Sequence, residues 1–222
     1  MYKGKFVVID GNDGVGKTSV LREVANKIKP YWPGKITTTF SPGDTPLGAH
    51  LRKLIKYPQD IDPNITIDNF SRQLFYIIDS INFINNKLIP SLDNGELVIS
   101  DRSSFVSAIV YGMADGVPTS KIKQLLELAT PPKMHRLYIL QCDAKVAFDR
   151  MRLRGERQDY FESKPFSFYN TINECYDKLF HDQECINLLS HSVDPINAIP
   201  VNVTRPIDDV VTTIIEDLKN SF

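Results

Sequence analysis

Five short apolar runs rich in Val and Ile recur along the chain, separated by segments with the spacing of amphipathic helices. The runs cover residues 6–9, 36–40, 97–99, 137–140 and 199–203. Strands that are apolar at nearly every position are typical of parallel sheets with helices on both faces. The pattern therefore predicts a single α/β domain over residues 1–222 with three layers and a five-stranded parallel sheet.

The clearest helical segment runs from about Asp68 to Leu88, where apolar residues return every three or four positions. Asp68 is a suitable N-cap, and Pro90 lies just past the expected end of the helix. A second stripe of this helix consists of Arg72, Tyr76, Asp79 and Ser80. Because polar helix faces usually meet water, the residue types alone favour a solvated stripe.

Charge and cysteine usage narrow the possible partners. The chain has 26 Lys and Arg against 27 Asp and Glu, so no net positive charge favours nucleic acid or an anionic membrane. Three cysteines without a C-x-x-C pair argue against a disulfide framework and a four-thiolate zinc site. No uncharged apolar run approaches the roughly 18 residues of a spanning helix, and no signal peptide is recognisable. We expect a cytoplasmic protein with small-molecule partners.

A glycine-rich motif follows the first apolar run. Residues 11–18, GNDGVGKT, fit G-x-x-x-x-G-K-[ST] between an expected strand and an expected helix. Gly11, Gly14 and Gly16 allow backbone N–H groups to turn toward a phosphate, and the helix N-terminus adds partial positive charge. Lys17 can reach the terminal phosphates, and the Thr18 hydroxyl can hold Mg²⁺. The motif predicts a nucleoside triphosphate site.

Two further segments carry charged side chains toward the same region. The third apolar run ends in Asp101 and Arg102, and the carboxyl ends of parallel strands face the ligand crevice. A carboxylate there can orient Mg²⁺, and a guanidinium can clamp a phosphate. Residues 150–157, RMRLRGER, contain four arginines. Charge runs are usually solvated, but this one follows the fourth strand and its helix, where a lid over the crevice is expected at about residues 150–162.

Four segments in this order resemble the thymidylate kinase family of P-loop nucleoside-monophosphate kinases. They are IDGNDGVGKTS, SPGDTPLGAHLRKLI, LFYIIDSINFINNKLIPSLDNGELVISDR, and RGERQDYFES followed by the helix FSFYNTINECYDKL. The resemblance covers nearly the whole chain, with Asp10 where the family usually has Glu. It implies a P-loop NTPase fold with strand order 2-3-1-4-5, a mobile lid, ATP and Mg²⁺ as cofactors, and a homodimer.

The same resemblance implies roles for residues on the donor side. The cofactor-binding set is Gly11, Asp13, Gly14, Gly16, Lys17, Thr18, Ser19 and Arg150, the last on the adenine ring. The expected metal ligands are Thr18 and Asp101. Because residues 12–15 of the P-loop contain no arginine, a lid arginine must stabilise the transferring phosphoryl group. The candidates are Arg152, Arg154 and Arg157, which join Lys17, Asp101 and Arg102 as expected catalytic residues.

On the acceptor side, the resemblance implies a substrate-binding set of Asp13, Arg72, Tyr76, Ser80, Arg102 and Ser107. Tyr76 would stack on the acceptor base and Arg102 would bind its phosphate. The chain departs from the family where Phe40 and Ser41 replace an Arg-Glu pair and where Ser80 replaces a base-reading arginine. Asp44 also replaces a glycine, and Tyr160 a lid arginine. Recognition of thymine therefore does not follow from the resemblance alone.

The leading interpretation is ATP- and Mg²⁺-dependent phosphorylation of a nucleoside monophosphate, most simply dTMP to dTDP. One alternative is a deoxynucleoside kinase that acts on a free 5′-hydroxyl, since that class shares a similar acidic-Arg-Ser sequence. Another is a nucleotide-dependent switch without an acceptor. The segment PGDTPLG and the helix after the lid favour the monophosphate kinase, and the chain lacks the N-K-x-D motif of GTPases.

Overall fold

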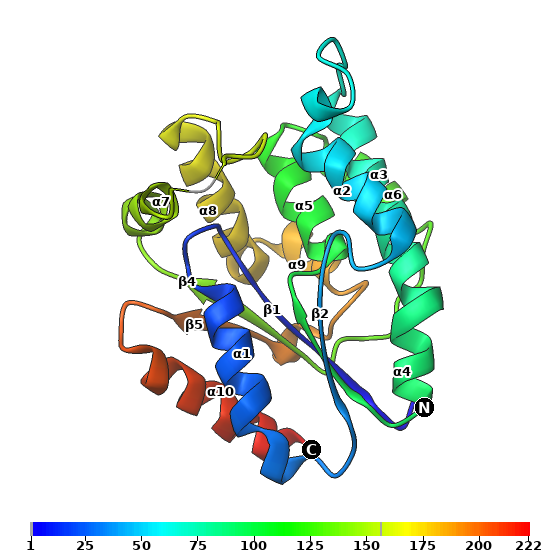
Figure 1. The fold of residues 1–222 in the computed structure, drawn as a ribbon, viewed down its shortest axis with the longest axis vertical. Coiled ribbons are helices and arrows are strands. Elements are labelled where there is room, and N and C mark those ends of the chain that lie inside the picture. Colours follow the sequence, from blue (N-terminus) through cyan, green and yellow to red (C-terminus); the bar gives the residue numbers. More distant parts are fainter. Residues whose placement is uncertain (1, 156) are drawn as a thin grey trace.

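Five parallel strands form the centre of the molecule in the order β2-β3-β1-β4-β5 (Figure 1). The structure is a computed structural model that describes residues 2–155 and 157–222. Its strands are β1 (Lys5–Gly11), β2 (Ile36–Phe40), β3 (Leu97–Asp101), β4 (Arg136–Gln141) and β5 (Ala198–Asn202). All strand pairs are parallel, with Val8 of the central strand opposite Ser100 on one side and Leu137 on the other. The predicted fold class and strand order are confirmed.

Helices cover both faces of the sheet, because the side chains of each buried strand alternate between two cores. Val7 and Ile9 join the core under α1 (Lys17–Lys27) and α10 (Ile207–Ser221). Phe6 and Val8 point the other way, into the larger core under α3 (Asn69–Phe83), α5 (Ser104–Ala114) and α8 (Phe166–His181). Figure 1 shows α1 and α10 together on one side and α3 and α5 on the other. The three predicted layers are present.

The remaining described helices lie around these layers. They are α2 (Pro46–Lys56), α4 (Ile89–Asp93), α6 (Thr119–Leu126), α7 (Ala144–Leu153) and α9 (Gln183–Leu189), with 3₁₀ turns at Lys29–Tyr31, Pro58–Asp60 and Pro195–Asn197. None of the helices in the described part of the chain is long and apolar enough to cross a membrane. The segment expected as a lid joins α7 to α8, and its residue 156 lies outside the described residues.

The long predicted helix begins as expected, but its end differs. Asp68 is the N-cap of α3, and its side chain accepts a hydrogen bond from the Ser71 amide at 2.9 Å. The helical path continues through a π-helical turn at Ile84–Leu88 into α4, so placing Pro90 beyond the helix was wrong. Proline lacks an amide hydrogen and its ring crowds the carbonyl four residues earlier. The wider π turn before it provides that room.

The polar stripe of α3 is buried, so the solvated interpretation was wrong. Arg72, Tyr76, Asp79 and Ser80 are all less than 5% exposed. The stripe packs in the part of the molecule where α2 and α5 meet α3, whereas Ile78 on the expected apolar face is 42% exposed. A helix between two others buries more than one stripe, which periodicity alone does not reveal.

Leu137 provides a test of the larger of the two cores. It is completely buried in β4, whereas Leu153 at the end of α7 is 85% exposed. Leu137→Ala is expected to lower the free energy of unfolding by about 2–5 kcal/mol, because it leaves a cavity in a packed interior. Leu153→Ala should change it by less than about 0.5 kcal/mol. Urea denaturation of both variants measures this, and equal effects would contradict the assigned burial.

Candidate functional site

The P-loop connects the end of β1 to the start of α1. Gly14 and Gly16 have φ values of 82° and 91°, a region that favours glycine. A Cβ atom on Gly14 would also collide with the Ala147 carbonyl of α7, so a larger residue would not fit there. Lys17 begins α1, as expected, and its Nζ donates a hydrogen bond to the Asn12 carbonyl at 2.8 Å. Burial, together with the neighbouring Arg102 charge, lowers the pKa of Lys17 to about 8.

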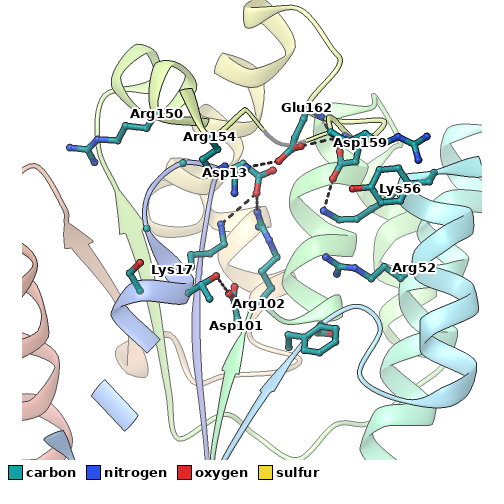
Figure 2. A pocket seen from close by; sticks show the side chains of 18 residues that line it. Asp13, Lys17, Arg52, Lys56, Asp101, Arg102, Arg150, Arg154, Asp159 and Glu162 are labelled. Atoms are coloured by element: carbon teal, nitrogen blue, oxygen red, sulfur yellow. Dashed lines mark hydrogen bonds and ion pairs between the residues drawn. The ribbon is translucent and has the colours of Figure 1, made fainter. Parts of the chain in front are cut away.

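A cleft of about 860 Å³ opens above the P-loop and the carboxyl end of β3 (Figure 2). Seven cationic side chains line it, namely Lys17, Arg52, Lys56, Arg102, Arg150, Arg154 and Arg157. Four acidic side chains also line it, namely Asp13, Asp101, Asp159 and Glu162. Figure 2 shows that these side chains come from the P-loop, from β3, from α2 and from the segment around α7 and α8. The positive excess makes the cleft suitable for phosphorylated ligands.

A hydroxyl and a carboxylate meet at the floor of this cleft. The Thr18 hydroxyl donates to Asp101 Oδ2 at 2.5 Å, and both residues line the cleft. Oxygen atoms are the ligands that Mg²⁺ prefers, and the ion usually keeps several waters and substrate phosphates as further ligands. In the described part of the chain, no three His, Cys, Asp or Glu residues converge as a metal cluster. One hydroxyl and one carboxylate therefore fit Mg²⁺ held with a nucleotide, but not a metal held by protein alone.

Arg102 connects the end of β3 to the P-loop. Its backbone has a φ of 72°, which is uncommon for a residue other than glycine. Its NH2 donates to Asp13 Oδ1 at 2.5 Å, and its NH1 donates to Asp10 Oδ1 at 3.2 Å and to the Gly11 carbonyl at 2.8 Å. Burial alone would raise the pKa of Asp13, but the adjacent Arg102 and Lys17 charges hold it well below its usual range. The guanidinium is therefore fixed at the rim of the phosphate site.

The four lid arginines do not share one environment. Arg150, Arg154 and Arg157 line the cleft. Arg152 is not among the lining residues, and its guanidinium lies 5.9 Å from the centre of the Phe148 ring. Arg150 extends from α7 to the side of the cleft, whereas Arg154 lies over the P-loop near Asp13 (Figure 2). The structure thus brings three of the four arginines to the site and places Arg152 outside it.

Ion pairs hold the segment between α7 and α8 in place over the cleft. Arg154 donates to Glu162 at 2.7 Å. Arg157 donates both of its terminal nitrogens to the carboxylate of Asp60, at 2.6 and 2.7 Å. The pair formed by Lys56 and Asp159 is more buried, with a separation of 2.5 Å between Nζ and Oδ2. The first pair lies within the lid segment, and the other two join that segment to α2 and to the turn that follows it.

Sequence reasoning missed Arg52 and Lys56, which lie one helical turn apart on α2 and point into the cleft (Figure 2). The Arg52 NH1 donates to the Pro42 carbonyl at 2.7 Å, and its guanidinium lies 5.6 Å from the Phe40 ring centre. Arg52 is the arginine of the segment SPGDTPLGAHLRKLI, so the motif contained a signal for it. For Lys56 the only signal was its position four residues after Arg52, which places both side chains on the same face of a helix.

The expected acceptor-side residues divide into two groups, since Asp13 and Arg102 line the open cleft and the other four do not. The Tyr76 and Tyr111 rings are nearly parallel, with centroids 6.2 Å apart. The guanidinium of Arg72 lies 3.8 Å from the Tyr160 ring centre, and its NH1 donates to the Ile55 carbonyl at 2.7 Å. None of Arg72, Tyr76, Ser80 and Ser107 lines the main cleft. Ser107 is buried, and its hydroxyl has no hydrogen-bond partner among the described residues.

Ser80 lines a small cavity of about 20 Å³ next to the main cleft. Ser41 and Arg102 line both spaces, so the cavity adjoins the phosphate site. Ser103 and Ser104 add further hydroxyls to its wall. The position where the family has a long cation is therefore occupied here by a short side chain beside a space with room for about one water molecule.

Comparison with known proteins agrees with this geometry. The family model for thymidylate kinase matches residues 9–199. A thymidylate kinase of Caldicellulosiruptor saccharolyticus is 30% identical over 94% of this chain and 98% of its own length. That of Carboxydothermus hydrogenoformans is 31% identical over 82% of this chain and 86% of its own length, and that of Blochmanniella pennsylvanica is 28% identical over 96% and 94%. With its P-loop, its strand-end Asp-Arg pair and its arginine-bearing segment above one cleft, the chain belongs to the thymidylate kinase family and is a phosphotransferase that acts on a nucleotide.

Proposed function

We propose that this phosphotransferase moves the γ-phosphoryl group of ATP, with Mg²⁺, onto dTMP to give dTDP. One observation carries the proposal. Lys17 at the start of α1 and Arg102, directly after β3, enter the same cleft, and Asp13 lies between them, 3.7 Å from Lys17 and 2.5 Å from Arg102. One cation belongs to the donor phosphates and the other to the acceptor phosphate. Their closeness brings the two reacting groups together, and such positioning supplies most of the catalysis in phosphoryl transfer.

The donor half of the reaction rests on the P-loop. Its glycine-rich backbone and the first turn of α1, with Ser19, bind the β- and γ-phosphates, and Lys17 neutralises their charge. Thr18 and Asp101 would hold Mg²⁺, which when bound neutralises charge on the phosphate oxygens. The adenine ring would lie against Arg150, which extends to the side of the cleft (Figure 2). Each of these residues lies on or next to the cleft that Lys17 enters.

The acceptor half rests on Arg102 and on the aromatic residues of α3 and α5. Arg102 would bind the acceptor phosphate with the guanidinium N–H groups that are not bonded to Asp10, Asp13, Gly11 and Tyr176. Tyr76 provides a ring face for the base, and the unpartnered Ser107 hydroxyl is available to a polar edge of that base. Tyr160 of the lid segment lies against the Arg72 guanidinium and Phe161 packs against Tyr111, so we expect the lid segment to move when the acceptor enters.

Removal of the P-loop cation tests the donor half. Lys17→Ala is expected to leave a folded protein whose kcat falls by about 10³ or more, because its charge acts on the transferring phosphoryl group. Lys27→Ala is the matched control, since Lys27 ends the same helix and pairs with exposed Asp208. Its kcat should stay within about twofold of wild type. Coupled ADP-release assays with ATP and dTMP, together with melting curves, measure this. Near-normal turnover by Lys17→Ala would refute the P-loop assignment.

A comparison of two lid arginines tests the assignment of the catalytic one. We propose Arg154, because it lies over the P-loop, whereas Arg152 lies against Phe148 outside the cleft. Arg154→Ala should lower kcat by about 10³ or more, the usual effect of losing an arginine that stabilises the transition state. Arg152→Ala should leave kcat within about threefold of wild type. Single-turnover rates with saturating ATP and dTMP distinguish the two variants. Equal losses would show that position over the cleft does not decide the role.

The base of the acceptor has a second candidate. That candidate is a pyrimidine nucleotide with a larger or more polar edge than thymine. It is supported by Ser80, a short hydroxyl-bearing side chain that lines the small cavity together with Ser41, Ser103 and Ser104. A serine offers a neutral donor and acceptor, while an arginine would offer only a charged donor. A site that lacks one charged hydrogen bond discriminates less sharply among bases.

The discrimination of bases gives a direct test at position 80. Wild type should use dTMP best among dTMP, dUMP, dCMP and dGMP, but by less than about a thousandfold in kcat/KM over the other pyrimidines. Ser80→Arg should increase the preference for dTMP over dCMP by about tenfold or more, and Ser80→Ala should change it by less than about threefold. A wild type that already prefers dTMP by more than that margin, with no gain from Ser80→Arg, would contradict the role of Ser80.

A further inference from the structure

The helix that follows the lid buries two tyrosines against the phosphate site. Helix α8 begins at Phe166, and Tyr169 and Tyr176 lie seven residues apart on it. This spacing is two helical turns, so both side chains lie on the same face. Tyr169 is 4% exposed and Tyr176 is 1% exposed. A buried phenol needs a hydrogen-bond partner, and both hydroxyls find one beside the P-loop.

The Tyr176 hydroxyl bridges the Asp10 carboxylate and the Arg102 guanidinium. It donates to Asp10 Oδ1 at 2.8 Å and accepts from Arg102 NH1 at 3.0 Å. Asp10 is fully buried and also accepts from the backbone amides of Gly11 and Ser103, at 2.8 and 3.1 Å. Burial and the adjacent Asp10 carboxylate raise the pKa of Tyr176 well above its usual value, so the phenol stays a donor at neutral pH. It links a carboxylate to a guanidinium without adding charge.

Arg102 depends on such support because its own backbone does not favour the observed conformation. A φ of 72° is costly for a residue with a side chain and persists only where surrounding contacts hold it. The Arg102 NH1 reaches three oxygens, those of Asp10, Gly11 and Tyr176. Asp10 and Gly11 are the last residues of β1, whereas Tyr176 lies on α8. It therefore ties the guanidinium to α8.

Tyr169 makes the equivalent connection to the donor side. Its hydroxyl donates to the backbone carbonyl of Asp13, and the Asn12 side-chain amide donates back to the Tyr169 carbonyl at 3.1 Å. The Asn12 carbonyl in turn accepts from Lys17 Nζ at 2.8 Å. The first turn of α8 thus holds the two P-loop residues that position the lysine.

We propose that Tyr176 and Tyr169 are positioning residues, through which α8 holds Arg102 for the acceptor phosphate and the P-loop for the ATP phosphates. The inference rests on the proposed function for the roles of Arg102 and Lys17. Neither tyrosine lines the cleft, so each acts through the group to which it is bonded. The two hydroxyls are therefore expected to affect different substrates.

Replacement by phenylalanine tests this, because it keeps the ring and removes only the hydroxyl. Tyr176→Phe should raise the KM for dTMP about tenfold or more and leave the KM for ATP within about twofold. Tyr169→Phe should do the reverse. Tyr138→Phe is the matched control, since Tyr138 is also buried but donates to Asp217 at 2.6 Å, and neither residue lines the cleft. It should leave both KM values unchanged. A Tyr176→Phe variant that alters both KM values equally would indicate a merely structural role and overturn the proposal.

A double-mutant cycle of Tyr176 and Arg102 shows whether Tyr176 acts through Arg102. In the Arg102→Ala background, Tyr176→Phe should change kcat/KM for dTMP by less than about twofold, although it lowers that value about tenfold or more in wild type. An undiminished effect in the Arg102→Ala background would overturn the proposal. If Tyr176→Phe does not fold, Asp10→Asn, which weakens the same link from its other end, should show the same dTMP-selective loss. Wild type without turnover on any monophosphate would instead contradict the proposed function, so the two failures are distinct.

Discussion

The burial of one guanidinium organises this active site. Arg102 lies among groups from the end of β1, the P-loop and α8, and a buried charge is costly unless it is paired and hydrogen-bonded. Asp10 and Asp13 provide the countercharge on two sides, and Tyr176 provides a neutral bridge between Arg102 and Asp10. Loss of any one partner would leave another buried and unsatisfied. The end of β3, the P-loop and α8 are therefore held in one relative arrangement.

The cleft above this network is lined by more positive than negative side chains, and the acidic ones pair with several of the cations. Arg154 is paired with Glu162, Lys56 with Asp159, and Lys17 lies 3.7 Å from Asp13. Substrate phosphates have to compete with these carboxylates for the same cations. Arg154 is 42% exposed in its pair with Glu162, so exchange of that pair costs little, whereas the pairs of Lys56 and Lys17 and the contacts around Arg102 are more buried. The lid side of the site can therefore rearrange, while the contacts around Arg102 stay fixed.

Several features of the fold and site were accessible from local sequence. The three central strands are near-continuous apolar runs, and Asp68 has the residue type and position of an N-cap. Residues 11–18 contain the glycines that the observed positive φ values favour. These predictions succeeded because each depends on neighbours within a few positions. The buried stripe of α3 and the π turn before Pro90 depend on helices packed from elsewhere in the chain, and the helical period does not include them.

The sequence by itself determined the class of fold, the glycine-rich loop after β1 and the position of Asp101 and Arg102 at a strand end, because glycine backbone freedom, strand burial and motif spacing are local properties. Only the tertiary structure decided which lid arginines reach the cleft and that α2 contributes Arg52 and Lys56. It also decided that Tyr176 meets Asp10, a residue 166 positions away. Such contacts arise from the packing of distant elements on one sheet edge, where position in space and not sequence spacing sets which charges meet.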